Sequence, residues 1–315
     1  MSDNNIVTLS NSKDQFHNLA QAMGMGADMV VKSKRSNLAR LKIDHFGLDG
    51  ETEIKGKKKT IKVIEPGCFS LELPDGDKVY QTNPKIRLFQ QKFMYKRYVS
   101  ANGNGEGKGM FIKTVMANDL KSDLVDNTGG VNCGKPSGWI EDYDALPDKT
   151  KQLIKSVKRV RVLFGLAAFD DAIDGQGLDI VDSSAKLTEV PFIYEVDNRE
   201  AFKIMGVPIG QMAKQNRILP QHWLALGTEQ RSIPTGAKYY VPSVELLPNI
   251  IELKQEDQSI FSDFADWIEN YNTWVSTSNQ EAIDVKKKEK DDKLVNEFVD
   301  IEETSGGTNP DGIPF

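Results

Sequence analysis

The stretch KIRLFQQKFMYKRYVSA, residues 85–101, predicts the strand around which the fold is organised. It mixes aromatic, β-branched and basic side chains over a length that suits an extended strand. The loop NGNGEGKG at 102–109 follows it, and MFIKTVMA at 110–117 predicts a return strand. A long antiparallel hairpin is therefore expected here.

Strand signals continue on both sides of this hairpin. Each combines partial or full alternation of apolar residues with Gly, Pro or Asp at its ends. In chain order they are TIKVIEP (60–66), a hairpin CFSLELPDGDKVYQ (68–81) turning at Asp75-Gly76, KRVRVLFGLAAF (158–169), VPFIYEV (190–196) and a closing β segment over 221–246.

Helical signals are fewer and lie mostly towards the two ends of the chain. The segment 259–275 is amphipathic and predicts a helix with Phe261, Phe264, Ile268 and Tyr271 on one face. The others are an N-terminal helix over 12–23, a short helix over 148–157, and a helix over 199–218 that is interrupted near Pro208.

This order of elements predicts a mainly β protein with flanking helices (α+β). We expect an OB-like antiparallel barrel with insertions, followed by a disordered acidic C-terminal tail. A β-sandwich with helical insertions fits the same order of elements. The expected organisation is an N-terminal helical and basic segment (1–50), an OB-like domain (51–250), a C-terminal amphipathic helix (251–288) and the tail (289–315).

Charge is unevenly distributed along the chain, whose net charge is -6. Residues 289–315 contain eight acidic residues and two lysines, so the tail accounts for the whole net charge. Residues 30–113 instead contain 18 Lys and Arg against 9 Asp and Glu. A basic front and an acidic tail indicate a polyanionic ligand and a separate function for the tail.

Interleaved cations and rings make 85–98 the best candidate for binding single-stranded DNA (ssDNA). Bases stack on rings while cations follow the phosphates. Strict alternation would place Arg87, Phe89, Phe93, Tyr95 and Arg97 on one face. The alternative is a half-buried strand with its rings in the core. With neighbouring basic and aromatic positions added, the candidate residues are Lys85, Arg87, Phe89, Lys92, Phe93, Tyr95, Lys96, Arg97, Tyr98, Lys108, Trp139, Lys158, Arg159 and Arg161.

No motif of this sequence predicts catalysis or a cofactor. The 102–109 loop departs from the phosphate-loop pattern, and two cysteines with three scattered histidines do not suit a metal site. The exception is an aspartate cluster between Asp170 and Asp182, which suggests a metal-dependent nuclease as an alternative. We therefore expect a binding protein without catalytic residues, metal or cofactor.

The chain ends in NPDGIPF after an acidic stretch. This ending resembles the C-terminal tip of bacterial and phage single-stranded DNA-binding proteins. The resemblance implies a protein that coats and protects ssDNA in replication, recombination and repair. It also implies that the tip recruits partner proteins through Asp311, Ile313, Pro314 and Phe315.

A second alternative is a strand-annealing or recombination mediator that assembles through its N-terminal segment. No apolar run approaches membrane-spanning length, and the first ten residues lack the features of a signal peptide. We expect a cytoplasmic protein without membrane contact, which could form homo-oligomers.

Overall fold

The structure is a computed structural model that describes residues 38–54, 57–100, 109–177 and 187–305. Sheet dominates this α+β fold. The strands are β1 (Ala39–Ile43), β2 (Leu48–Ile54), β3 (Lys57–Ile64), β4 (Phe69–Glu72), β5 (Lys78–Gln81), β6 (Lys85–Val99), β7 (Met110–Lys113), β8 (Lys158–Ala168), β9 (Val190–Val196), β10 (Trp223–Ser232) and β11 (Lys238–Leu246). The helices are α2 (Asp148–Ser156), α3 (Arg199–Ile204), α4 (Gly206–Lys214) and α5 (Gln255–Ser305), with short 3-10 turns η3 (Asn132–Gly134) and η5 (Leu219–Gln221).

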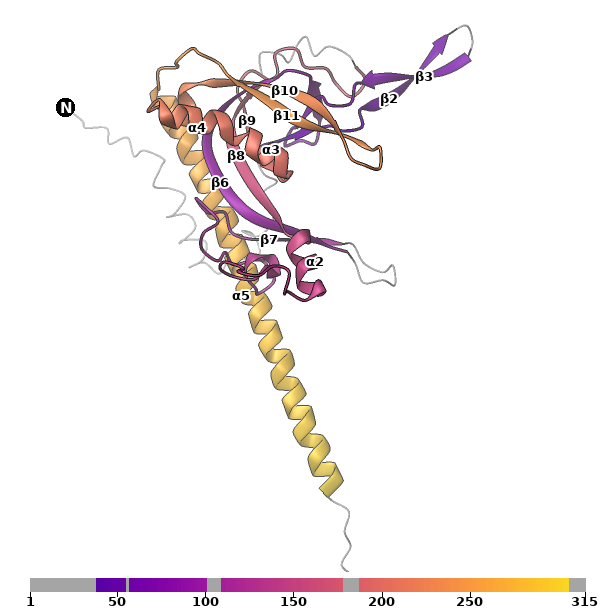
Figure 1. Ribbon diagram of the computed structural model, residues 1–315, viewed down its shortest axis with the longest axis vertical. Helices are drawn as coiled ribbons and strands as arrows, with labels where there is room; N and C mark the ends of the chain where they lie inside the picture. Colours follow the sequence, from indigo (N-terminus) through magenta and orange to yellow (C-terminus); the bar gives the residue numbers. More distant parts are fainter. Residues whose placement is uncertain (1–37, 55–56, 101–108, 178–186, 306–315) are drawn as a thin grey trace, which may run out of the picture.

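Within the described residues nine strands form one sheet, in the order β11-β10-β6-β8-β9-β1-β4-β5, and β7 pairs with the end of β6. The strands β2 and β3 form a separate two-stranded ribbon that projects from the body (Figure 1). The expected long strand and its return strand are confirmed as β6 and β7. All strand pairs are antiparallel except β1 with β9, which run parallel.

Two apolar cores lie on opposite faces of the central strands. The first contains Leu88, Leu163 and Phe192 together with residues of β1, β4 and β10, and α3 closes it with Ala201 and Met205. The second lies between the other face of the sheet and the first turns of α5, which Figure 1 shows running along one side of the body. The central strands β6, β8 and β9 are therefore covered on both faces over most of their length.

The sheet does not close into a barrel, so the barrel part of the expectation is not confirmed. The two edges of the sheet approach each other. Hydrogen bonds that involve side chains connect them, instead of backbone hydrogen bonds between adjacent strands. Thr228 of β10 donates to the carbonyl of Gly67 at 2.8 Å, and the amide of Tyr240 in β11 donates to His45 Nδ1 at 3.2 Å. A strongly curved open sheet is the observed architecture.

A bulge in β6 decides which side chains share a face. Leu88 pairs with Gly165 and Gln90 pairs with Phe164, so Phe89 is an extra residue without a partner in β8. One extra residue reverses the alternation beyond it. The expectation that Arg87 and Phe89 share a face with Phe93, Tyr95 and Arg97 is therefore wrong. Gly165 permits the close approach here, because a Cβ would lie 2.2 Å from the carbonyl oxygen of Arg87.

The helices differ from the expectations mainly at their ends. The break expected near Pro208 lies at Met205, and Pro208 is the third residue of α4, where no helical hydrogen bond needs its missing N–H. The helix α5 extends through 289–305, which had been assigned to the tail. Phe261 is half exposed rather than packed with Phe264 and Ile268. The expected N-terminal helix and the C-terminal tip lie outside the described residues.

Candidate nucleic-acid interface

Beyond the bulge, cations of β8 lie directly opposite aromatic residues of β6. Phe93 pairs with Arg161, and Tyr95 pairs with Arg159. Side chains of directly opposite residues share one face and lie within contact distance. We use the name cationic face for this surface and its borders, namely Phe93, Tyr95, Arg97, Lys135, Arg159, Arg161 and Phe202.

The guanidinium of Arg161 is held between two rings. Its Cζ lies 5.2 Å from the centroid of Phe93 and 4.6 Å from the centroid of Phe202 in α3. It donates from Nε to the Phe202 carbonyl at 3.2 Å and from Nη1 to Gln91 Oε1. Gly206 leaves room for it, since a Cβ there would lie 2.7 Å from Nη2. Burial lowers the pKa of Arg161, but arginine remains charged at neutral pH.

The other members of the cationic face differ in accessibility. Arg159 is exposed, and Phe93, Arg97 and Lys135 are half-buried. Tyr95 is only 4% exposed, and the ammonium of Lys135 lies 5.5 Å from its ring centroid. Burial raises the pKa of the Tyr95 hydroxyl. Tyr95 is therefore the floor of this surface rather than a ring on which a base could stack.

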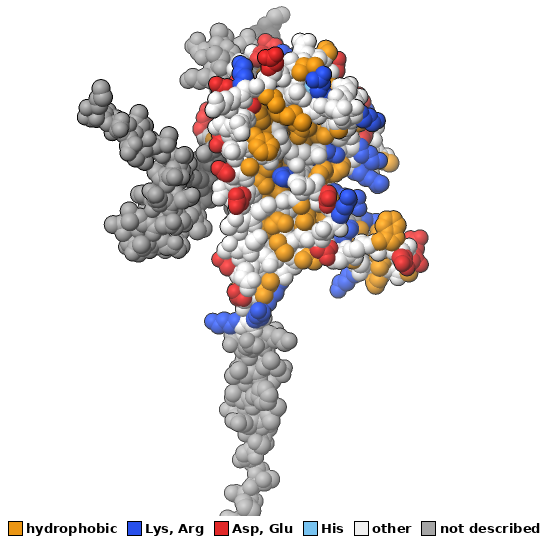
Figure 2. All heavy atoms as spheres, turned by 90° about the vertical axis from the view of Figure 1, so that its left-hand side faces the viewer, with side chains coloured by type: hydrophobic (Ala, Val, Ile, Leu, Met, Phe, Trp, Pro, Cys, Tyr) orange, Lys and Arg blue, Asp and Glu red, His pale blue; other side chains and the backbone are white. Residues whose placement is uncertain are grey.

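The cationic face carries a net positive charge. In the described part of the chain none of its four cations forms an ion pair. Two acids lie nearby: Asp126 accepts from the amides of Thr128, Gly130 and Cys133. Hydrogen bonds from Ser137 and Asn132, together with the charge of Lys135, lower the pKa of Asp123, so its carboxylate offsets part of the positive charge. In Figure 2 Lys and Arg side chains gather along the right-hand edge of the body, the side that carries α2 and α3 in Figure 1.

On the opposite face of the same strands the predicted cations have partners. Lys92 donates to Asn118 Oδ1 at 2.6 Å, and Lys158 pairs with Asp197 at 2.9 Å. Lys96 lies 2.7 Å from Glu195, which also pairs with Lys113. Lys158 is therefore neutralised by an ion pair, and Lys96 shares one carboxylate with Lys113. Asn118 accepts a hydrogen bond from Lys92 without cancelling its charge.

Two predicted ligands are buried beneath α5. Arg87 is 6% exposed and forms an ion pair with Asp257 at 2.7 Å, and Phe89 is 3% exposed with its ring 5.9 Å from that of Phe264. Neither side chain offers a surface to a DNA strand. The bulge is the reason, because it turns both residues towards α5.

The remaining predicted residues lie apart from the cationic face. Lys85 pairs with Asp170 at 3.4 Å near one end of β6. Tyr98 lies near the end of the β6–β7 hairpin, Trp139 is 89% exposed in the loop before α2, and Lys108 is outside the described residues. Sequence reasoning missed Phe202, because nothing along α3 distinguishes this ring from an ordinary core residue.

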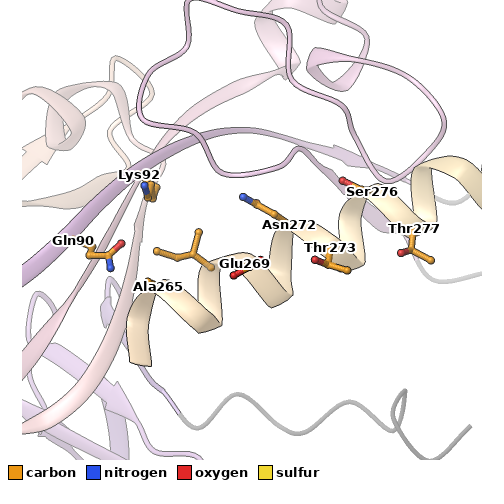
Figure 3. A pocket seen from close by; sticks show the side chains of 9 residues that line it. Gln90, Lys92, Ala265, Glu269, Asn272, Thr273, Ser276 and Thr277 are labelled. Carbon is orange, nitrogen blue, oxygen red and sulfur yellow. The ribbon is translucent and has the colours of Figure 1, made fainter. Parts of the chain in front are cut away.

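A cavity of about 460 Å³ lies between β6 and α5. In Figure 3 the side chain of Asn272 points from α5 towards the strand that carries Gln90 and Lys92, and Glu269 and Thr273 lie on the same helix. The residues that line it include no aromatic ring. It therefore lacks a platform for base stacking.

The aspartate cluster and the cysteines do not form a reactive centre in the described residues. Asp170 is paired with Lys85, Asp174 accepts from the amide of Gln176 at 2.8 Å, and residues 179 and 182 are not described. No group of three or more His, Cys, Asp or Glu in the described chain could hold a metal ion. Both cysteines are buried and free, and burial raises the pKa of Cys133 to about 12.

Among the described helices, none is long and apolar enough to cross a membrane. Comparison of the chain with protein-family models, with curated proteins and with solved structures finds no match in any of the three. The functional assignment therefore depends on the residues themselves.

Proposed function

We propose that this protein binds single-stranded DNA along the cationic face. The proposal rests on one observation. Rings of β6 lie directly opposite cations of β8 that form no ion pair among the described residues, where these strands extend beyond α3. Single strands need rings for their bases and cations for their phosphates, close together and without sequence-specific contacts.

Each part of the cationic face has a distinct role in this proposal. Arg97, Lys135 and Arg159 contact phosphates. Phe93 and Phe202, held against the Arg161 guanidinium, offer ring surface to a base, and such stacking contributes about 1 to 3 kcal/mol per base. The buried Tyr95 supports the other residues from below.

The C-terminal resemblance supports a cellular role for this binding activity. We propose that the protein coats and protects ssDNA during replication, recombination and repair. Partner proteins would be recruited through Asp311, Ile313, Pro314 and Phe315. In this role the protein binds rather than transforms its ligand.

Oligonucleotide binding at several salt concentrations tests the proposal. We expect a labelled oligo-dT to bind more tightly than a duplex of equal length. For three phosphate contacts, log K should fall with log salt with a slope of about -2. Binding that is independent of salt would contradict the assignment of the cationic face.

Two neighbouring residues provide a matched pair of variants. Arg159 and Lys158 are adjacent and exposed, but they point to opposite faces of β8, and only Lys158 has an ion-pair partner. Arg159→Gln should weaken ssDNA binding and reduce the salt slope by about 0.7, while Lys158→Gln should leave both unchanged. Equal losses in the two variants would mean that general charge, not this face, attracts DNA.

A further inference from the structure

The ends of β6 and β7 that adjoin the loop 101–108, which lies outside the described residues, expose apolar side chains on both faces of the hairpin. We call these strand ends the hairpin end. Tyr98 lies directly opposite Phe111, and Val99 lies directly opposite Met110. These four side chains are 55%, 49%, 37% and 49% exposed, respectively. An antiparallel ribbon ordinarily has one polar face. Figure 1 shows the paired ends of β6 and β7 extending away from the body.

The two rings at this hairpin end are held in place. The centroids of Tyr98 and Phe111 are 5.1 Å apart, and the ammonium of Lys96 lies 4.7 Å from the centroid of Phe111. A Cβ at Gly109 would lie 1.9 Å from the hydroxyl of Tyr98. The Tyr98 ring thus lies against the backbone at the last residue of the loop, just before β7, where only glycine leaves room for it.

The charges around the hairpin end are positive on both faces. Arg97 precedes Val99 on one face, which is continuous with the cationic face. On the other, Lys96 and Lys113 share the single carboxylate of Glu195, which leaves an excess of one positive charge. This positive charge suits a polyanion on both sides of the apolar end. It disfavours a basic protein as the partner.

We propose that this hairpin end is a wedge that enters the base stack where duplex DNA meets a single strand. Apolar side chains inserted between base steps unstack them. The strand that is released would then lie along the cationic face, which begins two residues away at Arg97. The protein would open base pairs without hydrolysing a nucleotide. This inference depends on the proposed ssDNA binding.

The rate of duplex opening tests the wedge separately from ssDNA affinity. The substrate is a short duplex with a single-stranded overhang, a dye and a quencher at the junction, and an excess of unlabelled trap strand. A protein that only captures frayed base pairs cannot open the junction faster than its base pairs fray spontaneously. That spontaneous fraying rate is the reference. We expect the full-length protein to exceed it.

The variant Met110→Thr/Phe111→Thr keeps β-forming residues in the hairpin while removing two of its four exposed apolar side chains. We expect its opening rate to fall about tenfold, equivalent to about 1.4 kcal/mol in the barrier, with unchanged oligo-dT affinity. Ile61→Thr is the matched control, because Ile61 is also an exposed apolar residue of a two-stranded ribbon. It should open the duplex at the wild-type rate.

Two outcomes would overturn the wedge. The first is a wild-type rate equal to spontaneous opening despite tight oligo-dT binding, and the second is an unchanged rate in the double variant. If that variant also changes its oligomeric state, the hairpin end would instead be assigned to contact between copies. A wild-type protein that fails to bind oligo-dT would instead overturn the proposed function, and the wedge with it.

Discussion

Glu195 lies between the ammonium groups of Lys96 and Lys113, at 2.7 and 3.1 Å. Burial alone would raise the pKa of this carboxyl, but the two ammonium groups outweigh burial and hold the pKa below its usual value. A carboxyl whose pKa is lowered by folding stabilises the native state above its unfolded pKa. That contribution is lost as the pH falls through the folded pKa.

We expect Glu195→Gln to lower the free energy of unfolding by about 2 kcal/mol at neutral pH, less than a fully buried pair would lose, because both lysines keep some solvent contact. The difference from wild type should shrink as the pH falls below the usual carboxyl range, since wild-type Glu195 then becomes neutral too. Urea denaturation at a series of pH values measures this.

The control is Asp197→Asn, which removes the carboxylate that pairs with the exposed Lys158. Exposed ion pairs contribute about 0 to 1 kcal/mol, so this variant should unfold almost as wild type does. An equally large, pH-independent loss in both variants would show that Glu195 acts through packing rather than charge.

Phe89 illustrates what sequence patterns omit at the scale of one residue. The sequence places rings and cations on one predicted strand, which is β6, but strict alternation assigns Arg87 and Phe89 to the wrong face. A hint was present in the partner strand, where Gly165 interrupts an apolar run, because glycine inside a strand often marks a bulge or a close approach. Which residue bulges depends on the pairing and cannot be read from β6 alone.

At the scale of elements, α5 is attached to the sheet by polar contacts at intervals along its length. Asp257 pairs with Arg87, Asn272 binds the backbone of Met116, and Lys286 donates to the carbonyl of Thr128 at 2.6 Å. The apolar contacts of Phe264 and Ile268 fill the interval between the first two. The helix is thus attached to the body up to about residue 286, with its buried residues ending at Val275.

The ion pair between Arg87 and Asp257 is the most buried of these contacts, with side chains 7% and 11% exposed. We expect Arg87→Met and Asp257→Leu each to destabilise the protein by about 3 kcal/mol, because each leaves a buried charge unpaired. The double variant should lose less than the sum, with a coupling energy of at least about 1 kcal/mol. Urea denaturation of the four proteins gives this value.

A surface pair serves as the comparison for this cycle. Lys42 and Glu72 are 3.1 Å apart with side chains 56% and 31% exposed, so their coupling should stay below about 1 kcal/mol. Strictly additive losses at Arg87 and Asp257 would contradict the view that this pair attaches α5 to β6.

At the scale of the whole molecule, the acidic charge and the apolar tip of the C-terminal segment lie in different parts of the sequence. Seven of its eight acidic residues lie in 289–305, within α5, and only Asp311 lies in 306–315 with the apolar tip. Among the described side chains, the last contact of α5 with the body is the hydrogen bond of Lys286 to the Thr128 carbonyl. Deletions that begin at residue 289 or 306 keep this contact, so the charge and the tip can be removed separately.

We expect deletion of 289–315 to leave the melting temperature unchanged and to keep or increase the affinity for oligo-dT, because the negative charge that competes with DNA is gone. Deletion of 306–315 alone should leave the affinity unchanged, since it removes one acid. Calorimetry and anisotropy titrations measure both properties. Weaker DNA binding after the longer deletion would contradict a competing role for the acidic segment.

Much of the fold was predictable because its signals are local. The hairpin at 68–81 turns at Asp75-Gly76 as expected, with Gly76 at φ 104, and VPFIYEV at 190–196 is β9. Helix α2 also begins at the predicted residue, Asp148. Turn residues and apolar periodicity act between neighbours in the chain, so they are legible in the sequence.

The sequence by itself determined the strands from β3 onwards, the separation of basic and acidic segments, and the presence of rings and cations on one strand; it predicted neither β1 nor β2. Only the tertiary structure decided the sheet order, the open edges, and which of these rings and cations remain accessible. The reason is physical: burial and pairing depend on residues far apart, as when Asp257 neutralises Arg87 and Phe202 covers Arg161. Local periodicity contains no record of such contacts.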